Sequence, residues 1–240
     1  MRTSTQNGLI IVVGVITTIA AINGLYLNYV KPALWIPLLL AAYVLILMGL
    51  YSIVLGEGRS PTPPLGQDHE DDGGHSHHGG TRIGWLLVVP FFLLAAVGPS
   101  PLGAYSAVQD DGLVPVTSAD DLPPLADGEI AEMSLWMFSS RALFDPGQSL
   151  ENQRVRLVGF SSPGEDGSWV LTRMKLNCCA ADGYAIKVAV SGAPDVPTNQ
   201  WVEVIGSWVP GPLATGESTE LANLDVQKLT QVPVPQNPYE

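Results

Sequence analysis

The two cysteines of this chain are neighbours, Cys178 and Cys179, in the run KLNCCAAD at 175–182. Thiolates are nucleophiles and ligands for soft metals. Adjacent Cα atoms lie about 3.8 Å apart, below the usual disulfide window of about 4.4–6.8 Å, so a bond between the two thiols would be strained. If the segment is a β-strand, one side chain packs inward while the other meets solvent, a ligand or a partner. The alternative is a pair of small buried hydrophobic side chains without chemistry.

A second group of potential ligands is the polar segment 56–82, which holds every histidine of the chain. Neutral imidazole binds Zn²⁺, Ni²⁺ or Cu²⁺, and neighbouring carboxylates add negative charge. Because the segment is rich in Gly and Pro and has no apolar period, we expect a disordered loop with weak, unselective metal binding. The alternative is a solvated loop that binds nothing. The histidines are His69, His75, His77 and His78, interleaved with Asp68, Glu70, Asp71 and Asp72.

Three apolar runs precede the cysteine region, at about 8–29, 33–55 and 83–105, and the apolar part of each lacks charged residues and histidine. A helix needs about 20 apolar residues to cross a bilayer, so we predict three transmembrane helices. A cleaved signal peptide is disfavoured because the first run exceeds the usual apolar length of about 7–15 residues. Transport pathways usually need ionisable groups within the bilayer, so these helices are better suited to anchoring and docking than to conducting ions.

Basic residues in the short loops predict the orientation. Arg2, Arg59 and Arg82 lie on one side of the predicted spans and Lys31 on the other. The positive-inside rule therefore places the N-terminus and the 56–82 loop in the cytoplasm, and the part after about residue 106 outside. A hydrocarbon layer of about 30 Å then separates the cysteines from the histidines. Further ligands for a metal at the cysteines must come from nearby residues such as Asp182, from another subunit or from a partner.

The part after residue 106 is acidic, with 18 Asp and Glu residues against 7 Lys and Arg residues. This balance argues against nucleic acid as a partner, because phosphate binding needs a basic surface. No phosphate-binding glycine loop, H-E-x-x-H or G-x-S-x-G motif occurs, and this part contains no histidine. These absences exclude the common acid–base and nucleophilic triads, so we expect a protein that is not an enzyme.

Residues 106–130 are predicted to form a linker, and 131–240 an extracytoplasmic, mainly β domain. Apolar residues recur at near-helical spacing over 130–144, and the following Asp-Pro-Gly predicts the end of that helix. Five short alternating segments follow and predict a small barrel of the OB type. The predicted strands are 153–160, 169–176, 184–190, 201–209 and 221–232.

Several of these segments resemble a known family. The stretch VRLVGF at 155–160, the pentad CCAAD at 178–182 and WVEVIG at 201–206 resemble the YcgQ-like family of bacterial membrane proteins, described as predicted permease subunits. The sequence FDPG at 144–147 and the plan of N-terminal spans before a β-rich domain extend the resemblance. Gly183 follows the pentad where that family is expected to have Ala. The resemblance marks Cys178, Cys179 and Asp182 as motif positions.

The same resemblance implies a larger YcgR-like permease as partner and an association with zinc-responsive genes. Taken with the residues, it predicts a non-enzymatic accessory subunit of a membrane permease that handles zinc or another divalent metal. The alternative is a membrane-anchored extracytoplasmic binding module that works independently of transport. A thiol-based redox protein is less favoured, because no C-x-x-C motif or activated thiol is evident.

Overall fold

The structure, a computed structural model, describes residues 3–56, 98, 100–112, 122–125, 130–164, 167–214 and 220–240. These residues fall into two compact units, one drawn from Met1–Tyr26 and Ala33–Ser100 and the other from Leu27–Pro32 and Pro101–Glu240. The predicted metal-binding loop and most of the predicted third span lie outside the described residues. The four histidines all lie there, at His69, His75, His77 and His78.

The first unit contains two apolar helices, α1 (Thr3–Ile22) and α2 (Trp35–Gly56). They approach each other at glycines, because a Cβ on Gly14 would lie 2.7 Å from Ile46 Cγ1 and one on Gly49 would lie 2.5 Å from Ile11 Cγ1. Small residues allow such close backbone contact. Gly24, just after α1, instead has a φ of +76° and no neighbour within 4 Å of a Cβ.

Among the described residues, one helix is long and apolar enough to cross a membrane, at Pro32–Leu55. The helix at Asn7–Ile22 is also apolar but shorter. A buried core helix or a signal sequence can have the same length and composition, so three transmembrane helices remain a prediction. Within the predicted first span, α1 ends at Ile22 and a separate 3₁₀ turn covers Leu25–Asn28.

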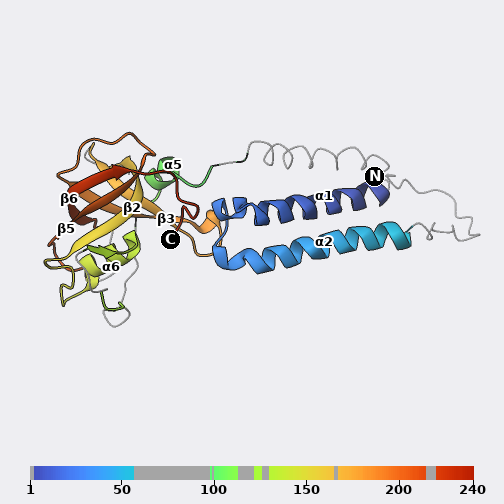
Figure 1. Ribbon diagram of the computed structural model, residues 1–240, viewed down its shortest axis with the longest axis horizontal. Helices are drawn as coiled ribbons and strands as arrows, with labels where there is room; N and C mark the ends of the chain where they lie inside the picture. Colours follow the sequence, from blue (N-terminus) through green and yellow to red (C-terminus); the bar gives the residue numbers. More distant parts are fainter. Residues whose placement is uncertain are drawn as a thin grey trace, which may run out of the picture. The chain divides into compact units, whose positions relative to one another are not determined.

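The second unit is built on a closed barrel of five strands (Figure 1). Neighbouring strands run in the order β2, β3, β4, β6, β5 and back to β2, and all pairs are antiparallel except β4 with β6. The alternating segments of the sequence correctly predicted all five. Their bounds are β2 (Arg154–Pro163), β3 (Trp169–Lys175), β4 (Tyr184–Ser191), β5 (Trp201–Val209) and β6 (Ala222–Gln231).

The segment before the barrel differs from its prediction. Helix α6 covers Leu135–Phe144, with the Ser134 hydroxyl accepting from the Met137 amide at its start and Asp145 at its end. The predicted helix therefore began too early. Residues Ile130–Glu132 instead form β1, which pairs in parallel with β2 at Arg154–Arg156. A partner more than twenty residues away decides the conformation of β1, and local spacing does not reveal it.

Two buried clusters fill the second unit. The larger joins α6 to the barrel interior and includes Leu135, Phe138, Leu157 and Val204. The smaller gathers Phe160, Met174, Leu176, Trp201 and Tyr239 around the short helix α5 (Ala104–Val108), whose Ala104 and Ala107 are buried. Figure 1 shows α5 and α6 on opposite sides of the barrel. Helix α5 thus covers the last two residues of the predicted third span and the first three residues of the predicted linker.

Residues 239 and 240 complete the barrel beside β3. Tyr239 forms a parallel bridge with Met174, and Glu240 exchanges backbone hydrogen bonds with Met174 and Leu176. The Glu240 carboxylate then accepts from the amides of Leu135 at 2.7 Å and Trp136 at 2.9 Å. These are among the amide groups that the start of a helix leaves unpaired, so Glu240 caps α6.

Candidate metal site at the cysteine turn

The cysteine pair lies in the connection between β3 and β4, not within a strand. Leu176 is the last buried residue after β3, Cys178 is exposed and Cys179 is partly buried. Cys179 has extended backbone angles and begins a 3₁₀ turn over Ala180–Asp182. The condition for opposite faces, a β-strand at this position, is therefore not met: both thiols belong to one turn, and neither forms a disulfide.

Asp182 organises this turn through its carboxylate. Oδ1 accepts from the amides of Asn177 at 3.0 Å, Cys178 at 3.1 Å and Cys179 at 3.2 Å. Oδ2 also accepts from the Cys178 amide, at 2.8 Å. The Cys179 side chain and the Asp182 side chain thus cap the turn reciprocally, as in a capping box. One carboxylate holds three consecutive amides and fixes the backbone that carries the thiols.

The Cys178 thiol donates a hydrogen bond to Asp182 Oδ2 at 2.7 Å. This hydrogen bond, with a smaller contribution from Cys179, raises the pKa of Cys178 from 9.0 to about 11. The same hydrogen bond, helped by the backbone amides, lowers the pKa of Asp182. At neutral pH, Cys178 is therefore a protonated donor and Asp182 an ionised acceptor, so the Cys178 thiol lacks the features of an activated nucleophile.

The donor atoms of Cys178, Cys179 and Asp182 all lie within 4.8 Å of one another. Zinc binds thiolate sulfur at about 2.3 Å and carboxylate oxygen at about 2.0–2.2 Å, so donor atoms around one tetrahedral ion lie roughly 3.5–3.8 Å apart. Cys178 Sγ and Asp182 Oδ2, which lie 2.7 Å apart, would therefore have to separate to share an ion. The set of two sulfurs and one oxygen suits zinc and other thiophilic divalent metals. These residues fit a three-ligand site with an open fourth position. Cys178 would have to lose its proton and its hydrogen bond to Asp182.

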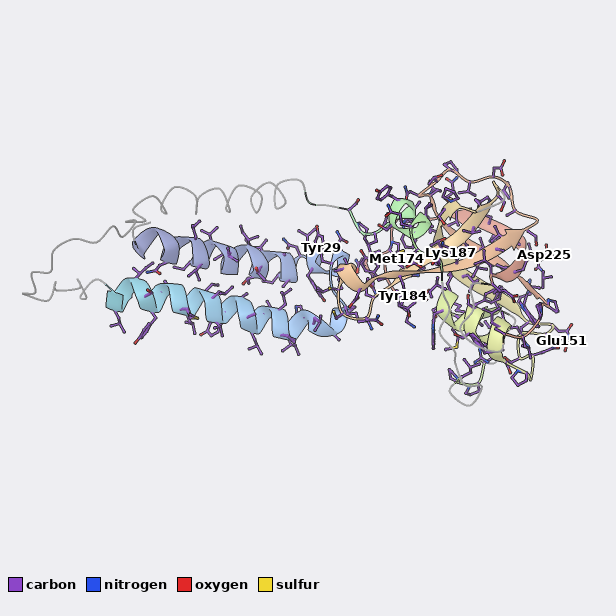
Figure 2. All side chains as sticks on the ribbon, turned by 180° about the vertical axis from the view of Figure 1, so that it is seen from behind. Tyr29, Glu151, Met174, Tyr184, Lys187 and Asp225 are labelled. Atoms are coloured by element: carbon purple, nitrogen blue, oxygen red, sulfur yellow. The ribbon has the colours of Figure 1, made fainter. Side chains whose placement is uncertain are left out.

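A segment from the N-terminal part of the chain, Leu27–Pro32, is hydrogen-bonded to the cysteine turn. Residues Leu27–Pro32 belong to the barrel unit, and Val30 forms an isolated antiparallel bridge with Cys179. The Ala180 amide donates to the Tyr29 carbonyl at 2.7 Å, and the Lys31 amide donates to the Cys178 carbonyl at 3.2 Å. Figure 2 labels Tyr29 in this segment and Met174 on the neighbouring strand.

Tyr239 and Gly183 support the turn from the barrel side. The Tyr239 hydroxyl donates to the Asn28 carbonyl at 2.8 Å and accepts from the Leu102 amide at 2.9 Å. A Cβ on Gly183 would lie 2.8 Å from Leu102 and 2.9 Å from Leu176, and Gly183 has ordinary extended backbone angles. Glycine at this position therefore permits close packing of the turn on the barrel.

Of the predicted site residues, the structure brings together Cys178, Cys179 and Asp182, and the four histidines lie outside the described residues. Within the described part of the chain, these three form the one group of at least three potential ligands. Sequence reasoning missed Tyr29, Lys31 and Tyr239. The spacing of Asp182 three residues after Cys179 was a usable signal for the turn, since it fits a capping box. No local pattern marks the contribution of Tyr29 or Lys31.

Comparison with known proteins gives one match. Residues 145–240 match the family model described as the DUF1980 C-terminal domain, an uncharacterised family. The matched residues begin at the end of α6 and include the barrel and the cysteine turn. No curated protein and no solved structure matches the chain. The barrel region is therefore similar to a domain of unknown chemistry, and any role must be argued from the arrangement of its side chains.

Proposed function

We propose that this chain is a non-enzymatic accessory subunit of a membrane permease and that its barrel presents a divalent metal ion, zinc first, to that permease. The observation that carries the proposal is the convergence of Cys178, Cys179 and Asp182 within 4.8 Å on one ordered turn. Two thiols and a carboxylate are a zinc-type ligand set. A turn that holds only three ligands suits transfer, because a partner can supply the fourth.

The site's exposure favours transfer over a structural role. Structural zinc sites are closed by four protein ligands, whereas this turn offers three and leaves Cys178 exposed. The barrel also has two buried apolar clusters that do not involve the cysteines. A metal at the turn is therefore not needed to form the core, and it can be gained and lost while the barrel stays folded.

The permease assignment rests on the apolar helices and on the resemblance to the YcgQ-like family. The segment Pro32–Leu55 is long and apolar enough to span a membrane, and it contains no charged residue. On this proposal the predicted spans dock on a larger YcgR-like subunit that contains the ion pathway. On the same proposal the barrel lies outside the cytoplasm, as the positive-inside rule predicts from the excess of basic residues in the opposite loops.

We also infer that the barrel is of the OB type. Numbering its strands from β2, the order around the barrel is 1-2-3-5-4-1, with the third and fifth strands parallel. Barrels of this type are small, partly open Greek-key structures that bind ligands on a strand face and its loops. The cysteine turn joins the second and third strands, whose face binds ligands in such barrels, and is distinct from the ligand-binding loops that follow the first and fourth strands.

The alternative is an extracytoplasmic binding module that needs the helices only as an anchor. The complete core of the barrel favours this reading, because such a domain could work on any tether. Replacing residues 1–26 and 33–100 by an unrelated membrane anchor, with residues 27–32 grafted onto the linker, separates the two functions. If the protein with the exchanged anchor still supports metal uptake, the independent module is favoured. If uptake is lost while the barrel still binds metal, the permease subunit is favoured.

Metal content of the purified full-length protein tests the proposal directly. We expect about one zinc per chain in the wild type, loss of that zinc in the Cys178→Ser/Cys179→Ser double variant, and retention when residues 57–82 are deleted. Co-purification with a permease subunit tests the second part of the proposal, that the chain belongs to a permease complex. Zinc that persists in the double variant, or a tagged protein that is always recovered without a permease, would contradict the proposal.

A further inference from the structure

The backbone of the candidate metal site is shared with the segment that joins the two apolar helices. Leu27–Pro32 contributes an antiparallel bridge at Val30–Cys179, and two hydrogen bonds link it to the same turn. One of these uses the carbonyl of Cys178 and the other the amide of Ala180. The groups that hold this segment are thus the peptide groups on either side of Cys179.

This contact is not required to complete the barrel. The strands close on themselves through β2 and β5, and Leu27–Pro32 pairs with none of them. The segment is short, and the Tyr239 hydroxyl also donates a hydrogen bond to its Asn28 carbonyl. A docking interaction of a few hydrogen bonds is weak, so small changes in the cysteine turn can shift its equilibrium.

We propose that metal binding at Cys178, Cys179 and Asp182 and docking of the segment Leu27–Pro32 are coupled, so that each strengthens the other. This inference rests on the proposed function. A bound ion fixes both thiols and the carboxylate, and thereby the carbonyl of Cys178 and the amide of Ala180. Conversely, a docked segment holds these peptide groups in the conformation that brings the three ligands together.

The consequence concerns the helices, because Leu27–Pro32 is continuous in sequence with α1 on one side and α2 on the other. Binding of metal at the site therefore changes how tightly the connection between the two apolar helices is held against the cysteine turn. Coupling between two binding events is reciprocal, so docking of the segment must strengthen metal binding by the same factor by which bound metal strengthens docking. That reciprocity provides a measurement that does not depend on transport.

Ala180→Pro removes the docking hydrogen bond with little change to the turn itself. Ala180 is the first residue of the 3₁₀ turn, where proline is well tolerated, and the extended angles of Cys179 suit a residue that precedes proline. The variant loses the amide that donates to Tyr29. Ala180→Gly is the matched control, since it alters the same side chain and keeps the amide.

The experiment uses the full-length protein in detergent with Co²⁺ as the probe, because thiolate coordination of cobalt gives a charge-transfer absorption band. We expect Ala180→Pro to bind Co²⁺ about five-fold more weakly than Ala180→Gly, the effect of about one hydrogen bond. Hydrogen exchange followed by mass spectrometry, on the wild type alone, should show slower exchange of the Lys31 amide after Co²⁺ is added.

The outcomes separate this inference from the proposed function. A thiolate–cobalt band with unchanged exchange at Lys31, or equal affinities of the two Ala180 variants, would overturn the coupling and leave the metal site in place. Failure of Co²⁺, Zn²⁺ and Cd²⁺ to bind the wild type would overturn both. Slower exchange at Lys31 that disappears in the Cys178→Ser/Cys179→Ser variant would support both.

Discussion

Cys178 Sγ and Asp182 Oδ2 lie 2.7 Å apart, with the thiol as donor and the carboxylate as acceptor. The carboxylate also binds the amides of the turn, so it positions the thiol and opposes its ionisation at the same time. A thiolate beside this carboxylate would be repelled by it. A divalent cation between them removes that repulsion, and this explains how an unreactive thiol can still be a metal ligand.

Thiol reactivity should reveal the hydrogen bond. Because the Asp182 carboxylate raises the pKa of Cys178 to about 11, little thiolate is present at pH 8, and reactivity should keep rising as the pH approaches 11. In a Cys179→Ser background, we expect iodoacetamide to modify Cys178 at pH 8 about ten-fold more slowly than an ordinary exposed thiol. The additional change Asp182→Asn should bring the rate back toward that of the ordinary thiol. A rate that levels off below pH 9 before the Asp182 change would contradict the prediction.

Helix α6 should lose stability when its distant cap is removed. Glu240 binds the amides of Leu135 and Trp136, and loss of a helix cap typically costs about 1 kcal/mol. We expect Glu240→Ala to lower the free energy of unfolding by about that amount in urea titrations, and Glu240→Gln to lower it less. Glu151→Ala removes the same charge from an exposed position labelled in Figure 2 and serves as the control. Equal effects at residues 240 and 151 would show that the cap contributes nothing.

Glycine is required at the irregularity between β5 and β6. A Cβ on Gly206 would lie 2.2 Å from the Asp225 carbonyl oxygen, next to the register shift at Ile205/Gly206. Backbone atoms cannot move aside as a side chain can, so Gly206→Ala should destabilise the barrel by about 1–3 kcal/mol. Gly211→Ala is the matched control, because nothing lies within 4 Å of its Cβ. Thermal unfolding of the two variants measures the difference, and similar melting temperatures would contradict the packing argument.

Acid should weaken the end of α6 through Asp145. Burial raises the pKa of this carboxyl, but hydrogen bonds from Ser149 and Gly147, together with Arg141, outweigh burial and lower it below 3.8. A lowered folded-state pKa stabilises the protein above the unfolded pKa, and the contribution is lost as the pH falls through the folded value. We therefore expect Asp145→Asn to reduce the free energy of unfolding at pH 7 and to have a smaller effect near pH 2. An effect that is independent of pH would exclude the ionised form as the cause.

The sequence predicted the strands well and the turn poorly, for a physical reason. Alternation of buried and exposed side chains is a local property, and it located β5 at Trp201–Val209 without error. The pairing of β1 with β2 and of Val30 with Cys179 depends on partners far along the chain. Within the candidate site, Asp182 could be predicted because its spacing to the cysteines is local. Tyr29 and Tyr239 could not, because only the closed barrel brings them to the turn.

The cap on α6 also sets an order of events during synthesis. The Leu135 amide is capped by a carboxylate that lies 105 residues later in the chain. The first turn of α6 therefore lacks this hydrogen bond while the ribosome translates every strand of the barrel. Contacts at such long range close slowly and late. We expect nascent chains that stop before residue 240 to leave this helix frayed and accessible to proteases, even when all five strands have emerged.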